Sequence, residues 1–271
     1  ADQAMYAAKS AGRRTYRFFT PEMQHEAERR QSLQNDLRIA LIRHEFEVHY
    51  QPIVDHQGKA VKVEALVRWN HPEQGRISPD QFIPLAEETG LIITLGGWVF
   101  EQAVRDIAKI HKQYPDLGVA INLSSKQIGT DSPHTEHFID ILQQYDLPSS
   151  HVTLEVTESL FLDPSGDSVT KLKNLRHQGF GVAIDDFGTG YSSLSYLKQL
   201  PLTTIKIDKS FVSDLDKDFG DKILVDAILS IAESMQLSVI AEGVETQAQA
   251  DYLIGKGAQM QQGWLYGRPM P

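Results

Sequence analysis

Two hydrophobic periods alternate along this chain of 271 residues, from about residue 45 to the C-terminus. Apolar residues at every second position indicate strands, and apolar residues at every third or fourth position indicate helices. Strands are expected at residues 47–54, 61–69, 119–123, 152–156, 181–185, 204–208, 238–242 and 259–264. Helices are expected at residues 79–88, 97–113, 134–145, 168–178, 192–200, 221–235 and 247–256. Eight strands with helices between them predict an α/β fold, a TIM-like (β/α)8 barrel.

The first connection departs from this alternation. Residues 54–59, Val-Asp-His-Gln-Gly-Lys, form a turn that is too short to hold a helix. The first two strands are therefore expected to form an antiparallel hairpin. The predicted barrel is irregular, with an antiparallel first strand.

The N-terminal part of the chain carries a different pattern. Residues 1–20 indicate a helix and a short strand with no partner elements before them, and the run ADQAMYAAKSAGRRTYRFF resembles the end of a GGDEF (diguanylate cyclase) domain. A charged helix is expected from Pro21 to about residue 44, and its first half is polar nearly all round, as is typical of a linker between domains. We expect a GGDEF remnant at 1–20, a linker helix at 21–35 and the barrel domain at 36–271. A chain that begins at Ala1 rather than Met is expected to be a piece of a longer protein.

Polar residues occupy one face of six predicted strands. Because successive side chains of a strand point to opposite faces, the apolar set suits the layer under the helices and the polar set should point into the barrel. The polar set comprises Glu64, Arg68, Asn122, Glu155, Asp185, Lys206, Asp208 and Glu242. Most of these residues lie near the C-terminal end of their strand, where barrel enzymes place catalytic groups. The shared parity favours a functional site over isolated, satisfied core groups.

The charges at this mouth indicate metal chemistry. Six carboxylates would meet there: Glu64, Glu155, Asp185, Asp186, Asp208 and Glu242. Arg68 and Lys206 bring two cations, so six minus two leaves roughly four uncompensated negative charges, which two divalent cations would balance. With the Asn122 amide the ligands are all oxygen, which favours Mg²⁺ or Mn²⁺ over zinc. Paired metals suit phosphodiester hydrolysis. The alternative is an enolase-like barrel with one Mg²⁺, a carboxylate substrate and Lys206 as the base.

The segment at residues 180–193 has two interpretations when it is taken alone. An apolar run ends in Asp185 and Asp186, which are followed by Gly188, Gly190 and a helix-start pattern at Ser192. The two acids would either cap the following helix and satisfy turn amides, or hold a divalent cation. If the strand curls at the glycine turn, the adjacent aspartates would reach two ions.

Composition limits the partners. The formal net charge of −10 argues against a sequence-independent grip on a nucleic acid polymer, but not against a small phosphorylated ligand held through metals. The chain has no cysteine, which excludes disulfides and thiolate metal sites. No signal peptide is visible, and the longest apolar run, residues 91–100, is too short to span a bilayer. We expect a cytoplasmic domain, which leaves room for a membrane anchor in a longer native chain.

Seven motifs together resemble the EAL-domain family, phosphodiesterases of cyclic di-GMP. They are EALVRW at 64–69, INLS at 121–124, LEVTE at 154–158, DDFGTGYSS at 185–193, KID at 206–208, AEGVE at 241–245 and QG at 262–263. The resemblance runs in the family's order from about residue 36 to the C-terminus. Val67, where leucine is frequent in the family, is the one visible variation in the first motif, and every metal-ligand position matches.

This resemblance implies a reaction and a set of ligands. One phosphodiester of cyclic di-GMP would be hydrolysed to linear 5′-pGpG by a water activated by two Mg²⁺ or Mn²⁺ ions, which would end a bacterial second-messenger signal. The implied metal ligands are Glu64, Asn122, Glu155, Asp185, Asp186 and Glu242. The implied catalytic residues are Glu64, Lys206 and Asp208. Lys206 would hold or deprotonate the nucleophilic water, and Asp208 would orient that lysine.

The resemblance also implies substrate contacts and supporting residues. The substrate-binding residues would be Gln51, Leu66, Arg68 and Gln262, with Arg68 on a phosphate. Glu158 would anchor the loop after Asp186, which contains Gly188 and Gly190, and Glu245 would have a similar supporting part. The implied partners are cyclic di-GMP, a second copy in a homodimer, and an upstream GGDEF domain.

Two other functions are weighed against hydrolysis. Degenerate relatives lose these acids and bind cyclic di-GMP without cleaving it, so a catalytically silent receptor is the alternative. An interaction module whose barrel is only a scaffold is the third interpretation. Five further residues are assigned roles outside the site: His134 and His137 at a solvated helix start, His71 in a loop at the rim, and Trp98 and Trp264 in the core.

Overall fold

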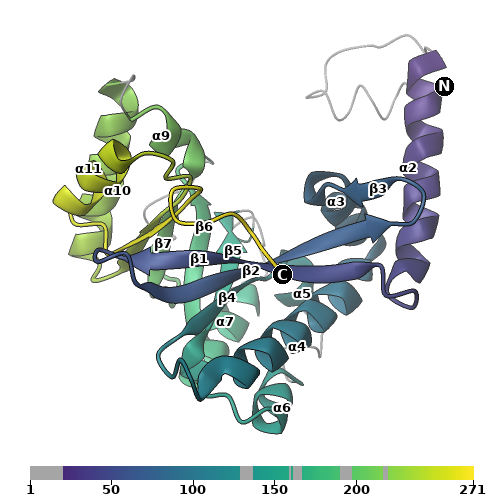
Figure 1. Ribbon diagram of the computed structural model, residues 1–271, viewed down its shortest axis with the longest axis horizontal. Helices are drawn as coiled ribbons and strands as arrows, with labels where there is room; N and C mark the ends of the chain where they lie inside the picture. Colours follow the sequence, from purple (N-terminus) through teal and green to yellow (C-terminus); the bar gives the residue numbers. More distant parts are fainter. Residues whose placement is uncertain (1–20, 129–136, 159, 161–166, 190–196, 216–218) are drawn as a thin grey trace. The chain divides into compact units, whose positions relative to one another are not determined.

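The computed structural model describes residues 21–128, 137–158, 160, 167–189, 197–215 and 219–271 (Figure 1). It divides into two compact units, one made of Ala1–Phe46 with Trp69–Leu91 and the other of Glu47–Arg68 with Ile92–Pro271. The expected GGDEF remnant lies outside the described residues. Each unit is described by itself below.

The smaller unit is held together by an aromatic cluster and a helix pair. The rings of Phe46, Trp69 and Phe82 lie within 5.8 Å of one another, and the indole N–H of Trp69 donates to Glu45 at 2.9 Å. Its elements are α2 (Pro21–Ala40), β3 (Gly75–Ile77) and α3 (Pro79–Thr89). The expected linker helix is thus helical as far as Ala40.

The second half of α2 has an apolar face. Leu33, Leu37 and Ala40 are buried at helical spacing, and α2 packs against α3. In the same unit, His71 is buried in strand β2 with its Nε2 3.4 Å from the Asp36 carboxylate. The expectation of a rim loop residue at this position was wrong, because the strand continues beyond its expected end.

The larger unit is a closed barrel of eight strands. These are β1 (Phe46–Asp55), β2 (Ala60–His71), β4 (Gly118–Asn122), β5 (Val152–Thr157), β6 (Gly181–Phe187), β7 (Thr204–Ile207), β8 (Ser238–Ala241) and β9 (Met260–Gln262). The order is β1-β9-β8-β7-β6-β5-β4-β2, and pairing of β1 with β2 closes it. β1 is antiparallel to β9, whereas the neighbouring barrel strands from β2–β4 round to β8–β9 pair in parallel; the short β3 pairs with β2 in antiparallel fashion. The irregular barrel predicted from the sequence is confirmed.

Helices cover the outside of the barrel. They are α4 (Leu91–His111), α5 (Ser125–Ile128), α6 (His137–Gln144), the 3-10 turn η2 (Ser149–His151), α7 (Asp167–His177), α9 (Lys209–Ser213), α10 (Phe219–Ser234) and α11 (Gln247–Gly255). α4 begins six residues earlier than expected because it includes Gly96 and Gly97, and Gly96 lies so close to Gln127 that a larger side chain would collide. Most of the helix expected at 192–200 lies outside the described residues.

Among the described helices none is by itself long and apolar enough to cross a bilayer, and α3 and α4 pass that test only as a bent pair.

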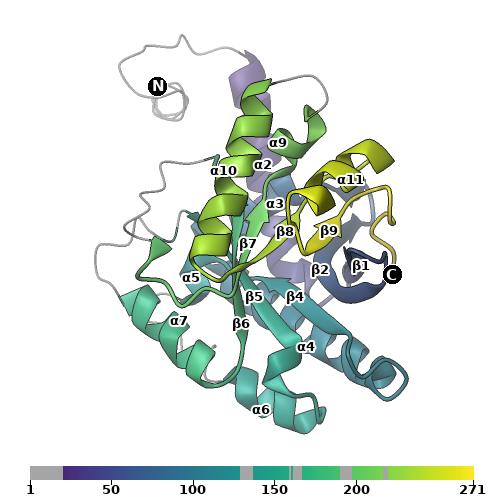
Figure 2. The same cartoon turned by 90° about the vertical axis from the view of Figure 1, so that its left-hand side faces the viewer.

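Two apolar layers confirm the strand parity. Ile184, Ile205 and Val239 face outward and pack under the helices, with α10 lying along β7 and β8 (Figure 2). Inside the barrel, Ile53, Ala120 and Ile240 form a small fully buried cluster. These apolar side chains fill the middle of the barrel. The polar residues on the same inward strand faces therefore lie at the carboxyl ends of the strands.

Candidate metal centre and active site

The polar residues predicted to face inward meet at the carboxyl ends of the barrel strands. Pairing places Glu155 beside Asn122, and Lys206 precedes the last residue of β7. Glu64 lies near the end of the part of β2 that pairs with β4, and Glu242 directly follows β8. Parallel strands bring these ends to one rim, so residues far apart in sequence share a single site.

A buried ammonium group lies at the centre of this acidic cluster. Lys206 is fully buried, and its Nζ lies 2.6 Å from Glu242, 2.8 Å from Glu155, 3.0 Å from Asp185 and 3.8 Å from Glu64. Burial by itself would lower the pKa of Lys206, but the surrounding carboxylates outweigh it and raise that pKa well above its ordinary value. Lys206 is therefore the fixed positive charge around which the acids collect.

Two amides orient Glu64. Asn122 Nδ2 donates to Glu64 Oε1 at 2.8 Å, and Gln262 Nε2 donates to Glu64 Oε2 at 2.6 Å. Gln262 Nε2 also lies 3.1 Å from Gln51 Oε1, and Gln51 Nε2 donates to the carbonyl of Gly267 at 3.0 Å. Burial would raise the pKa of Glu64, yet Lys206 and these amides hold it below its ordinary value. The side chain is thus fixed as a carboxylate.

A bulge in β6 explains how two adjacent aspartates both reach the mouth. Ile184 pairs with Ile205 and Phe187 with Ile207, so β6 carries one more residue than β7 over this stretch. Asp186 takes up the irregularity with a φ of 53°, a left-handed conformation that aspartate tolerates better than most residues. The curl occurs at the aspartates themselves: Asp186 lies two residues before Gly188, the start of the glycine turn to which the sequence interpretation assigned it.

Two groups of three carboxylates share Asp185. One is Glu64, Glu155 and Asp185, and the other is Asp185, Asp186 and Glu242, with one oxygen from each residue within 4.8 Å of the others. Glu155 Oε1 is buried without a hydrogen-bond partner in the described part of the chain. An all-oxygen donor set with an unpaired buried oxygen fits a hard divalent cation. The acidic cluster is therefore a candidate metal centre.

The remaining acids of the cluster show the strain of shared charge. Burial raises the pKa of Glu155 well above its ordinary value. Burial, and then the nearby Asp185, raise the pKa of Glu242 to about 7 against the attraction of Lys206. Burial, Asp185 and Asp208 raise the pKa of Asp186 to about 6. These three acids therefore favour retaining protons, and shifted pKa values of this kind are concentrated at functional sites.

The structure gives Asp208 partners other than the expected Lys206. Its carboxylate accepts from the backbone N–H and the hydroxyl of Ser210 and lies in hydrogen-bond contact with Asp186, and it caps α9. Burial would raise its pKa, but the bonds from Ser210 lower it. Ser210 was not singled out in the sequence, although an acid followed two residues later by serine at a helix start is a recognisable capping signal.

The loop after β6 is tied to Glu158. Glu158 Oε1 accepts from the backbone N–H of Gly188 at 2.9 Å, which is the anchoring contact expected from the sequence. Gly190 lies outside the described residues. Glu245 is exposed, and its backbone N–H donates to Gln249, so its carboxylate lies outside the buried cluster. Glu158 and Glu245, for which a similar supporting role was expected, therefore lie in different environments.

The two expected substrate residues on β2 lie beyond Glu64 along the strand. Leu66 and Arg68 are both half-buried, and Arg68 Nη1 donates to the carbonyl of Val67 at 3.1 Å. Since Glu64, Leu66 and Arg68 alternate along one face, they point to the same side of β2. This places both residues where they would border a ligand at the cluster.

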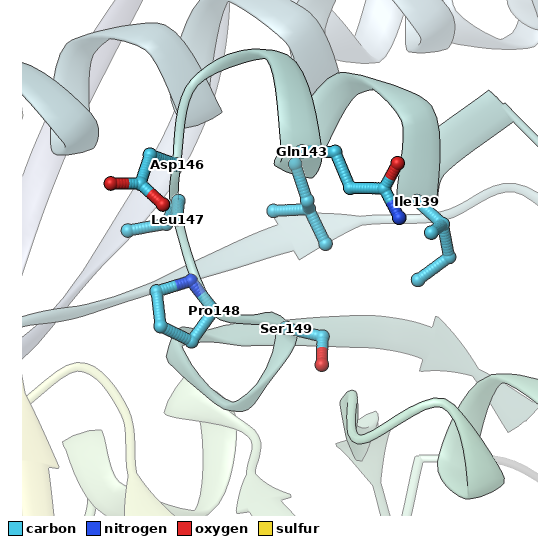
Figure 3. A pocket seen from close by; sticks show the side chains of 7 residues that line it. Ile139, Gln143, Asp146, Leu147, Pro148 and Ser149 are labelled. Carbon is cyan, nitrogen blue, oxygen red and sulfur yellow. The ribbon is translucent and has the colours of Figure 1, made fainter.

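A hollow elsewhere on the barrel unit lacks such chemistry. It lies at the C-terminal end of α6 and is lined by Ile139, Leu142, Gln143, Asp146, Leu147, Pro148 and Ser149 (Figure 3). Among these seven residues, all of them described, Asp146 carries the only charge. We therefore place the functional site at the acidic cluster.

Substituting Asp186 by asparagine or by alanine separates its charge from its backbone conformation. Both variants remove a carboxylate that lies beside Asp185 and Asp208, but only asparagine retains a donor for Asp208 and a preference for positive φ. We expect Asp186→Ala to be about 1 kcal/mol less stable than Asp186→Asn. Urea denaturation in EDTA measures the difference, and equal stability of the two variants would contradict the conformational role.

Comparison with known proteins gives a consistent family. A profile of the EAL domain matches residues 34–269. The chain is 43% identical over 273 residues to the bifunctional diguanylate cyclase/cyclic di-GMP phosphodiesterase MucR of Pseudomonas aeruginosa, covering 100% of this chain and 40% of MucR. It is 40% identical over 271 residues to the cyclic di-GMP phosphodiesterase PdeR of Escherichia coli, covering 100% of this chain and 41% of PdeR. The chain thus spans about two fifths of the length of these curated relatives.

Solved structures resemble the described fold closely. A structure of the PaMucR phosphodiesterase in complex with c-di-GMP has a TM-score of 0.84 at 43% identity, covering 89% of this chain and 98% of that one. The EAL enzyme Bd1971, in a form with cAMP and cyclic di-GMP bound, has a TM-score of 0.86 at 36% identity, covering 90% of this chain and 67% of that one. With a family profile that spans the whole barrel, the chain belongs to the EAL domain family.

Proposed function

We propose that this chain hydrolyses cyclic di-GMP to linear 5′-pGpG with the help of two bound Mg²⁺ or Mn²⁺ ions. The observation that carries the proposal is the pair of carboxylate groups that share Asp185 around Lys206. Relatives named as cyclic di-GMP phosphodiesterases, and a related structure in complex with c-di-GMP, support the choice of substrate.

The donor set determines which residues would hold the ions. Glu64, Glu155, Asp185, Asp186 and Glu242 offer carboxylate oxygens. Asn122, whose Nδ2 donates to Glu64, would contribute its amide oxygen. Bound divalent ions would lower the pKa of a water molecule and offset the charge of the phosphate. Oxygen ligands without histidine or thiolate favour Mg²⁺ or Mn²⁺.

The protein's own groups would orient the reactants. Asn122 and Gln262 hold both oxygens of Glu64, which fixes this ligand before substrate arrives. Lys206 would donate a hydrogen bond to the attacking water and keep it in line with the phosphorus. The water oxygen forms a bond to phosphorus and gives up one proton, the bond from phosphorus to the ribose 3′ oxygen breaks, and that oxygen takes up one proton and leaves as the 3′ hydroxyl. The product keeps its phosphate on the 5′ oxygen.

A product assay with metal titration tests the proposal. The purified protein is incubated with cyclic di-GMP in Mg²⁺, Mn²⁺ or EDTA, and the nucleotides are separated by reversed-phase chromatography. We expect linear 5′-pGpG with either metal and none in EDTA. Tight binding without turnover would indicate a silent receptor instead, and absence of binding would leave the barrel as a scaffold.

Dimerisation and an upstream GGDEF domain belong to the same proposal. The contact from Glu158 to Gly188 ties the loop after β6 to β5, so the loop offers a route from a neighbouring copy to Asp186. Sedimentation of the protein with and without cyclic di-GMP tests for the dimer. Activity that is unaffected by a substitution that breaks the dimer would count against a regulatory role.

A further inference from the structure

Trp264 is exposed at the rim of the barrel. Its exposed fraction is 57%, so the sequence interpretation of this tryptophan as a core residue was wrong. Trp69, by contrast, is fully buried and Trp98 is half-buried. A single exposed aromatic residue is common on protein surfaces, so the position and the neighbours of Trp264 decide whether it has a role.

The chain around Trp264 is fixed beside the acidic cluster. Trp264 lies two residues after Gln262, whose amide donates to Glu64. The backbone N–H of Val244 donates to Gln262, and that of Leu265 donates to Val244, which pins this segment to the loop after Glu242. A side chain at Gly263 would bring its Cβ within 2.0 Å of the Val244 carbonyl oxygen, so only glycine permits this approach. Trp264 therefore stands on a rigid support at the mouth.

A cation covers one face of the indole. The guanidinium carbon of Arg268 lies 4.5 Å from the centroid of the Trp264 ring, within the range of a cation–π contact. Arg268 follows Gly267, whose carbonyl accepts a hydrogen bond from the Gln51 amide; that amide in turn accepts from Gln262. The contact restrains the ring, and because 57% of Trp264 is exposed, much of its surface remains accessible to a ligand. It also adds a positive charge at a mouth whose centre is acidic.

An aromatic ring beside a cation is the arrangement that proteins use to stack single nucleobases. We propose that Trp264, backed by Arg268, is the stacking platform for one guanine base of the dinucleotide. This inference rests on the proposed function, because it assumes that a guanine nucleotide occupies the cluster. Trp264 then acts as a binding residue for one base of the dinucleotide, and the reacting phosphate would lie deeper, at the carboxylates.

Kinetics of matched variants test the platform. Trp264→Ala removes the ring, and Trp264→Phe keeps a smaller one. We expect the KM for cyclic di-GMP to rise about tenfold in Trp264→Ala and to stay within about threefold in Trp264→Phe, with kcat nearly unchanged in both. Tyr114→Ala serves as the control, because Tyr114 is also an exposed aromatic residue but precedes β4 and so lies at the opposite end of the strands.

Intrinsic fluorescence provides a readout that does not need turnover. Cyclic di-GMP added in EDTA should quench the tryptophan emission of the wild type by stacking on Trp264. Trp264→Phe should still bind the nucleotide by calorimetry but lose this quench. Retention of the wild-type quench in Trp264→Phe, or an unchanged KM and Kd in Trp264→Ala, would overturn the platform.

The outcomes separate this inference from the proposed function. If the wild type binds cyclic di-GMP but does not cleave it, hydrolysis fails while the Kd values of the variants still decide the stacking role. If the wild type neither binds nor cleaves, both fail. The exposed Leu265 and Met270 lie near Trp264 in sequence, so sedimentation is measured in parallel. A changed oligomeric state with unchanged nucleotide affinity would assign the patch to contact between copies and overturn the stacking role.

Discussion

Replacement of Lys206 by methionine is expected to lower the free energy of unfolding of the metal-free protein by about 3–5 kcal/mol. The four carboxylates within 4 Å of its Nζ would then face one another with no cation among them. Methionine matches the length of the lysine stem, so the loss reflects charge more than volume. Urea denaturation in EDTA measures this effect, and the variant should also lose hydrolysis of cyclic di-GMP.

Two further measurements give this result its meaning. Lys209→Met removes a lysine three residues away that is exposed, so it should change the free energy of unfolding by no more than about 0.5 kcal/mol. Added Mg²⁺ or Mn²⁺ should stabilise Lys206→Met by binding the folded form and replacing part of the missing charge. A Lys206→Met variant as stable as the wild type would mean that the acids are held by protons rather than by the lysine.

Glu64→Gln is expected to reduce kcat/KM for cyclic di-GMP by about a thousandfold or more, roughly 4 kcal/mol of transition-state stabilisation. The substitution removes one negative charge from a candidate metal group. It also turns one carboxylate oxygen into an NH2 group that faces the amide donor of Asn122 or of Gln262. A donor placed against a buried donor leaves both unpaired, which costs about 1–3 kcal/mol.

An exposed glutamate provides the control for the expected loss of activity in Glu64→Gln. Glu101→Gln makes the same chemical change on an exposed glutamate of α4 that accepts from the Tyr145 hydroxyl, and it should leave kcat/KM unchanged. Metal affinity, measured by calorimetry, should fall in Glu64→Gln and not in Glu101→Gln. Activity of Glu64→Gln within tenfold of the wild type would refute the assignment of Glu64 as a metal ligand.

The barrel and most of the acidic cluster could be predicted from the sequence because both depend on local periodicity. Alternating residues along a strand fix which side chains face inward, and eight such strands determine where their ends meet. This is why the sequence alone predicts that Glu155 and Lys206 face the inside of the barrel. The short β3 and α9 were missed because three to five residues are too few to show a period.

Other features depend on contacts between segments that are distant in sequence. The bulge at Asp185 and Asp186 is a difference in register between β6 and β7, and neither strand alone contains it. The partners of Asp208 depend on how α9 begins after β7. Tryptophan is a large apolar residue of the kind that is usually buried in a core. Trp264 is exposed here, next to the close packing of Gly263 on Val244. Local patterns do not report such pairwise constraints.

The ammonium of Lys206 is part of the polypeptide. Every newly made chain therefore carries one positive charge of its own for each acidic cluster. We therefore expect the barrel to fold without bound ions, unlike small metallodomains that fold only on binding metal. If the proposed hydrolysis needs divalent ions, their supply would control how fast each molecule works rather than how many molecules are folded. A cell that runs short of these ions would keep an inactive reserve of the protein, ready to respond as soon as the supply returns.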